Sequence, residues 1–149
     1  MLTEIYTTKN AEAYKILENA RWGIHPTCPY CANTKVWRHP DEDREMPRWQ
    51  CGGCKRAFCA TVKTFLHKTR VPLRIWFLSF AYLSERERIN ISEFARDVGL
   101  KRRATASRII NTIRQSLVTE VDDARIIKNI AKHYGIDALY IDNVKMECL

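Results

Sequence analysis

The sequence predicts an α+β fold that is mostly α-helical, in which a small β ribbon precedes a helical domain that contains a helix-turn-helix. Two observations predict this division. Two Cys-x-x-Cys pairs enclose short extended runs in the first half of the chain, and apolar residues recur at helical spacing through the second half. The 149 residues, 46% of them hydrophobic, suffice for one ordinary domain or two small ones. The expected segments are an N-terminal helix in 1–23, the ribbon in 24–67, the helix-turn-helix domain in 68–118, and a C-terminal helix with a short tail in 119–149.

The first helix is expected over residues 10–22, because apolar residues recur there at helical spacing and residues 23–26 (Gly-Ile-His-Pro) end the pattern. Beyond it, the runs 35–38 and 48–50 are short and extended, and the polar segment 40–47 separates them. This alternation predicts a hairpin with a loop.

Helical spacing returns after Pro72, which fits the first turn of a helix. One apolar stripe follows at i, i+3, i+4, i+7 and i+8, formed by Leu73, Trp76, Phe77, Phe80 and Ala81. Ser92 is the expected cap of a second helix that ends near Gly99, and a third helix is expected to begin within residues 104–107.

A fourth helix is expected from Thr119 onward, because acidic residues occupy its first turn, lysines lie near its end and Gly135 follows it. Residues 138–142 fit a short strand.

The cysteine pairs predict a zinc site. Cys28 and Cys31 form one Cys-x-x-Cys pair and Cys51 and Cys54 form another, with 19 residues between the pairs. Two residues between thiolates let one tight turn aim both sulfurs at the same ion, and the intervening Gly52-Gly53 permits positive φ and close backbone approach. Four thiolates complete a tetrahedron and leave no position for water, so the expected zinc is structural.

Other uses of these side chains remain open at this point. The cysteines could be redox dithiols or unligated core residues, and His25 or His39 lies close enough to replace one thiolate. Cys59 and Cys148 have no partner at ligand spacing, and Cys59 is expected to be a small buried residue.

Basic residues are concentrated in one stretch of the chain. The formal net charge is +8 and the isoelectric point lies near 9.3, while residues 68–114 contain 11 Lys or Arg and 4 Asp or Glu, a net +7. A local excess of this kind favours a polyanionic partner, and a solvated basic surface is the alternative.

Polar residues interrupt the first ten positions, so no signal peptide is expected. The longest apolar run, residues 73–83, contains Arg74 and is shorter than the ~20 residues that span a bilayer. We therefore expect an intracellular protein with no membrane partner, nuclear in a eukaryote and cytoplasmic in a bacterium.

Residues 91–100 match the first helix and turn of a helix-turn-helix. Ala95, four residues before Gly99, allows close helix packing, and the glycine reverses the chain. The next helix begins with basic and hydroxylated residues, which can reach phosphates and base edges of double-stranded DNA. We assign Lys101, Arg102 and Arg103 to phosphates, Thr105, Ser107 and Arg108 to the groove, and Arg70 and Arg74 to an extension of the phosphate track. An ordinary helical hairpin with a solvated basic face is the alternative.

These segments resemble the zinc ribbon and following helices of Merlin-type and related bacterial insertion-sequence transposases. The resemblance spans residues 17–114 and is carried by Leu17-Glu18, Arg21–Gly23, the two cysteine pairs, and the segments 49–58 and 64–77. It implies an N-terminal unit that binds DNA at element ends, followed by an RNase H-like domain with three metal-binding carboxylates. Tyr140-Ile141-Asp142 resembles the first catalytic strand of that domain.

Only seven residues follow Asp142, whereas the catalytic core needs three carboxylates brought together by a sheet. We therefore expect no enzymatic activity and interpret Asp142 as a relic or a turn residue. The expected function is sequence-specific binding of DNA as a regulator or accessory factor, with zinc as cofactor and possible homodimerisation. The alternatives are a zinc-ribbon interaction subunit with protein partners in a larger transcription or translation assembly, and a truncated transposase.

Overall fold

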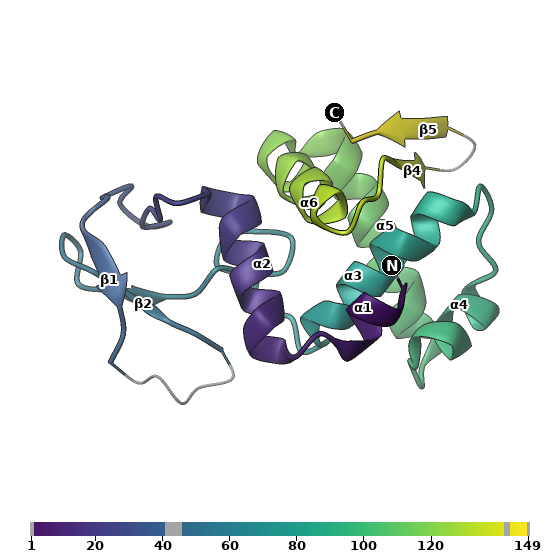
Figure 1. Ribbon diagram of the computed structural model, residues 1–149, viewed down its shortest axis with the longest axis horizontal. Helices are drawn as coiled ribbons and strands as arrows, with labels where there is room; N and C mark the ends of the chain where they lie inside the picture. Colours follow the sequence, from purple (N-terminus) through teal and green to yellow (C-terminus); the bar gives the residue numbers. More distant parts are fainter. Residues whose placement is uncertain (1, 41–45, 142–143, 149) are drawn as a thin grey trace.

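A computed structural model of the chain describes residues 2–40, 46–141 and 144–148. A β ribbon lies at one end of the molecule, helix α2 lies beside it, and the remaining helices form the other end, where both termini are found (Figure 1). The fold is therefore α+β and mostly α-helical, as the sequence predicts. The helices are α1 (Leu2–Thr7), α2 (Asn10–Trp22), α3 (Leu73–Glu85), α4 (Ile91–Val98), α5 (Arg103–Thr119) and α6 (Val121–His133).

The ribbon is a three-stranded antiparallel sheet in the order β1-β2-β3. Its strands are β1 (Val36–Arg38), β2 (Trp49–Cys51) and β3 (Ala57–Phe58). Val36 pairs with Cys51, and Trp49 pairs with Phe58. The first two strands lie within a residue of the expected extended runs, whereas β3 is only two residues long and leaves no periodic pattern in the sequence.

The helical end is built on α3, whose predicted apolar stripe is buried throughout. One continuous core contains side chains from all six helices, and the hairpin of β4 (Ala138–Ile141) and β5 (Val144–Glu147) lies against α3 through β4. Helix α1 and strand β5 had no counterpart in the sequence-based expectations. Within the described residues, no helix combines the length and apolarity that crossing a bilayer requires.

The start of α4 differs from the sequence-based expectation. Asn90, not Ser92, caps the helix, since its side-chain oxygen accepts a hydrogen bond from the backbone N–H of Glu93 at 3.1 Å. Gly99 ends α4 with φ 84°, in the left-handed region that glycine adopts without a steric cost. Residues 99–102 then connect α4 to α5.

A second, smaller core holds the ribbon together. It consists of Cys28, Cys51 and Phe58, and it is separate from the helical core. Trp22, at the end of α2, packs against both cores and meets Trp49 and Phe58 edge-on at ring-centroid distances of 6.3 and 5.8 Å. Helix α2 therefore fixes the position of the ribbon relative to the helices.

Candidate metal centre and basic surface

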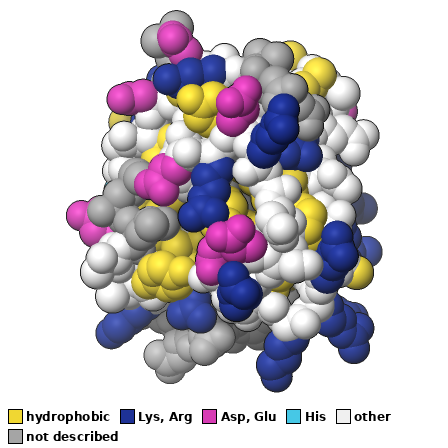
Figure 2. Space-filling view, turned by 90° about the vertical axis from the view of Figure 1, so that its right-hand side faces the viewer, with side chains coloured by type: hydrophobic (Ala, Val, Ile, Leu, Met, Phe, Trp, Pro, Cys, Tyr) yellow, Lys and Arg dark blue, Asp and Glu magenta, His cyan; other side chains and the backbone are white. Residues whose placement is uncertain are grey.

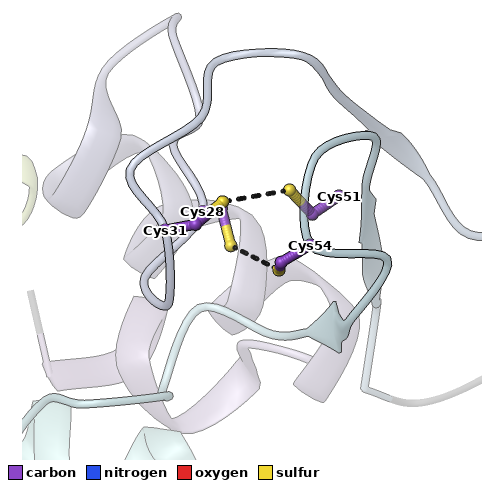
Figure 3. Close-up of side chains that lie close together, drawn as sticks. All are labelled: Cys28, Cys31, Cys51 and Cys54. Atoms are coloured by element: carbon purple, nitrogen blue, oxygen red, sulfur yellow. Dashed lines mark hydrogen bonds between the residues drawn. The ribbon is translucent and has the colours of Figure 1, made fainter.

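The four predicted cysteines converge on one point, from the turn before β1 and the turn after β2 (Figure 3). All four Sγ atoms lie within 4.8 Å of one another. The Cys28–Cys54 and Cys31–Cys51 sulfur distances are 3.7 and 3.5 Å. A disulfide would need about 2.05 Å, whereas a tetrahedron with Zn–S bonds of about 2.3 Å has edges of about 3.8 Å.

Both cysteine pairs adopt the same turn. The backbone N–H of Cys28 donates to the carbonyl of Asn33 and that of Cys51 donates to the carbonyl of Arg56, each across five residues and at 3.0 Å. The residue after each pair has positive φ, namely Ala32 at 63° and Lys55 at 65°. The equivalent turns aim the two sulfurs of each pair at the common point.

The sequence suggested that the glycines of the second pair adopt positive φ, but neither Gly52 nor Gly53 does. Their role is close approach, which the sequence also predicted. A Cβ atom on Gly52 would lie 3.0 Å from the carbonyl oxygen of Lys35, and one on Gly53 would lie 2.5 Å from the side chain of Asn33. The absence of a side chain thus lets the second turn pack against the first.

Backbone groups support negative charge on the sulfurs. The N–H of Tyr30 donates to Cys28 Sγ at 3.4 Å, and the N–H of Gly53 donates to Cys51 Sγ at 3.3 Å. Burial raises the pKa of Cys51, but the backbone N–H groups of Cys54 and Gly53 together with the neighbouring thiols outweigh it and lower this pKa to about 6. Thiolate is the form that binds a metal, so the turn prepares Cys51 as a ligand. At Cys54 the backbone N–H of Arg56 favours the thiolate, but burial and the neighbouring thiols outweigh it and raise the pKa to about 11.

Four thiolates at these separations fit zinc, and they form a zinc-ribbon-like metal-binding site. The cluster contains neither His25 nor His39. Cys59 is buried, as expected, with its sulfur 3.1 Å from the hydroxyl of Thr61, and Cys148 is buried as well. Because zinc with four thiolates has no open position, the site supplies structural stability rather than a reactive water.

The ribbon is joined to α2 by a buried carboxylate. Glu18 accepts hydrogen bonds from Arg38 Nη1 and from the indole N–H of Trp49, both at 2.9 Å. These donors lie on β1 and β2, so one side chain of α2 holds two strands. No pattern in the sequence indicates this role, because a glutamate in an amphipathic helix is ordinarily solvated.

The residues predicted to bind DNA lie mostly at the surface. Lys101, Arg102, Arg103 and Arg108 are exposed, whereas Thr105 and Ser107 are half-buried. Arg70, in the loop before α3, and Arg74, in the first turn of α3, are exposed as well. In the view of the helical end, Lys and Arg side chains line the lower and right-hand edges, and acidic side chains lie toward the upper left and the centre (Figure 2).

Helix geometry divides the predicted residues of α5 between two flanks. Thr105 and Arg108 are three residues apart and share one flank, while Arg103 and Ser107 are four apart and share the other. Exposed Asn111 continues the second flank, and its amide suits base recognition. The predicted set did not include Asn111, since one asparagine carries no pattern of its own.

Two open clefts are lined by basic residues that lie away from the start of α5. One of about 540 Å³ is lined by Lys9, Arg70 and Arg74 among others. The second, of about 440 Å³, brings Arg70 together with Arg108. Asp142, interpreted from the sequence as a relic of a catalytic strand or a turn residue, lies outside the described residues.

Comparison with known proteins assigns one segment near the N-terminus to a known type of domain. Residues 9–57 match the family model described as "Transposase zinc-ribbon domain". The match contains α2, all four cysteines and strands β1 and β2. No curated protein and no solved structure matches the chain. The N-terminal part therefore carries a zinc ribbon of the transposase type.

Proposed function

We propose that this protein binds duplex DNA sequence-specifically, that its zinc ribbon is structural, and that α4 and α5 act as a helix-turn-helix. The observation that carries the proposal is the start of α5. Lys101 and Arg102 precede the helix, Arg103 begins it, and all three are exposed, while Ala106, Ile109 and Ile110 of α5 are fully buried. A helix anchored on one face and basic at its first turn suits insertion into a major groove.

The elements around α5 hold it in place. Asn90 caps α4, and the backbone N–H of Leu100 returns to the carbonyl of Ala95 at 2.8 Å, which fixes the turn at Gly99. Phe94 is fully buried and meets Tyr82 of α3 at 5.1 Å between ring centroids. A rigid support of this kind is what a base-reading helix requires.

In this proposal the cations and hydroxyls have separate roles. Lys101, Arg102 and Arg103 contact phosphates and set the register, since phosphate contacts carry no sequence information. Thr105, Ser107 and Arg108 reach base edges or adjacent phosphates, and Arg108 can form a bidentate pair with guanine. The transposase-type ribbon supports a nucleic-acid partner. We further propose that the protein works as a regulator or accessory factor.

A second candidate function is contact with a protein partner through the ribbon. Trp37 on β1 is 50% exposed and Ile24 is 83% exposed. Tryptophan is enriched at protein–protein interfaces and among the residues that contribute most to binding. This function is compatible with DNA binding by α5, because the exposed side chains lie on a different part of the chain.

Selection from random duplexes tests the proposed function. The zinc-loaded protein should enrich a defined motif, and the enriched duplex should bind at least 10³-fold more tightly than a scrambled one, as specific DNA-binding proteins do. Equal affinities for the enriched and scrambled duplexes would reject sequence-specific binding. Binding only to a protein partner would favour the second function.

A further inference from the structure

A groove lies where the loop between the ribbon and α3 meets α5. It measures about 440 Å³ and brings together segments that are far apart in the sequence. The loop contributes residues 65 and 67–70, α3 contributes Trp76, and α5 contributes Arg108 and Thr112. Arg108 and Thr112 lie one turn apart on the same flank of α5.

The lining of this groove is basic. His67, Lys68, Arg70 and Arg108 line it, and none of its described lining residues is acidic. Within the described part of the chain, no hydrogen bond or ion pair engages the side chains of Lys68, Arg70 or Arg108. These cations are therefore available to an anion in solution.

Several hydrogen bonds hold the loop in one conformation. The backbone N–H of Lys63 donates to His67 Nδ1 at 2.8 Å, and the indole N–H of Trp76 donates to the hydroxyl of Thr69 at 3.2 Å. The N–H of Phe65 donates to Asp123 on α6 at 3.3 Å. These bonds order the loop backbone before a ligand arrives, so binding does not have to supply the entropy of ordering it.

Two local features of the loop bear on anion binding. Lys68 has φ 59°, a left-handed conformation that L-residues with a side chain rarely adopt. His67 accepts a hydrogen bond at Nδ1, so in the neutral ring Nε2 carries the proton and can donate. The loop thus presents an N–H donor, an ammonium and a guanidinium beside Arg108.

We propose that this groove binds the sugar–phosphate backbone of the duplex, with the loop residues His67, Lys68 and Arg70 on one side and Arg108 and Thr112 on the other. The inference rests on the proposed function and extends it, because the DNA site then includes the loop that follows the ribbon. Arg70 also lines the neighbouring cleft with Lys9 and Arg74, so the backbone has a basic path beyond the groove. A backbone fits better than a small anion, since an open groove and several separated cations suit an extended polyanion.

The test compares salt-dependent binding of the full chain and its variants to random and enriched duplexes. Arg70→Gln and Arg108→Gln should each lower the salt slope by about 1, and the double variant by about 2, if each guanidinium meets a phosphate. Thr112→Glu places a carboxylate in the groove without removing a cation, and it should weaken binding to both duplexes alike. Lys132→Gln and Val118→Glu carry the same charge changes at exposed sites outside the groove, and they should leave the slope and the affinity close to wild type.

Zinc content and thermal unfolding should stay unchanged in all variants, which confirms that they fold. If the groove variants keep the wild-type slope while neutralising Lys101, Arg102 and Arg103 lowers it, the groove inference is overturned and the proposed function stands. If Thr112→Glu and Val118→Glu weaken binding equally, the groove is likewise excluded as the contact. If the wild-type chain binds no duplex, both proposals fail together.

Discussion

Glu18 accepts a 2.9 Å hydrogen bond from the indole N–H of Trp49, and this bond ties the central strand of the ribbon to helix α2. The same carboxylate pairs with Arg38 on β1. Side chains of α2 are buried in the helical core. The bonds of Glu18 therefore hold the metal-binding ribbon in place against the helical part of the molecule.

Replacing Glu18 by alanine should lower the free energy of unfolding by about 2 kcal/mol, because hydrogen bonds to charged groups contribute about 1.5–3 kcal/mol and a buried indole N–H loses its partner. Urea unfolding of the zinc-loaded protein measures the change. Glu12→Ala, at an exposed position of the same helix, is the control and should have little effect. Equal losses in the two variants would show that Glu18 is not a special anchor.

Zinc should be present at about one ion per chain, and Cys51→Ser should abolish it, because binding energy at a four-cysteine site is part of the folding energy. The ribbon should unfold while most helical signal remains, since the helical core is separate from the ribbon core. Elemental analysis and far-ultraviolet circular dichroism measure both. Zinc-free protein prepared without chelator, with a folded ribbon, would contradict the assignment.

Asn90→Ala should destabilise the protein by about 1 kcal/mol, the usual cost of losing an N-cap side chain. It should also weaken DNA binding, because α4 supports α5. Ser92→Ala is the matched control, since Ser92 is the cap that the sequence favoured but the structure does not use. A larger loss of stability for Ser92→Ala than for Asn90→Ala would show that Ser92, not Asn90, is the N-cap of α4.

These comparisons show which features follow from sequence alone. The cysteine spacing predicts the metal site because a two-residue gap and a tight turn already determine where both sulfurs point. The stripe of α3 is predictable because helical periodicity is local. The sequence predicts the wrong N-cap for α4, Ser92 instead of Asn90. Both residue types are good caps, and only the tertiary position of the chain decides where α4 begins.

Long-range packing accounts for what the sequence did not predict. The groove between the loop and α5 depends on Trp76 reaching Thr69 and on Asp123 of α6 reaching the loop backbone. The buried role of Glu18 depends on the ribbon folding back on α2. None of these contacts leaves a spacing pattern, so Lys68 and His67 were not among the predicted DNA-binding residues.

The chain should neither cut nor join DNA with magnesium or manganese. The four-cysteine cluster should not support this chemistry, because thiolates prefer zinc to the hard cations that phosphoryl transfer uses. A supercoiled plasmid incubated with the protein should stay intact. Nicking that disappears in an Asp142→Ala variant would show instead that Asp142 belongs to a working catalytic site.

The salt dependence of duplex binding tests the central claim most directly. The wild-type affinity should fall steeply as salt rises, and simultaneous Lys101→Gln, Arg102→Gln and Arg103→Gln substitution should lower the slope of log K against log salt by roughly 2 to 3, if each residue meets a phosphate. Zinc content should be unchanged in the triple variant. A slope equal to that of the wild type would place the DNA-binding surface away from the start of α5 and contradict the proposed function of that helix.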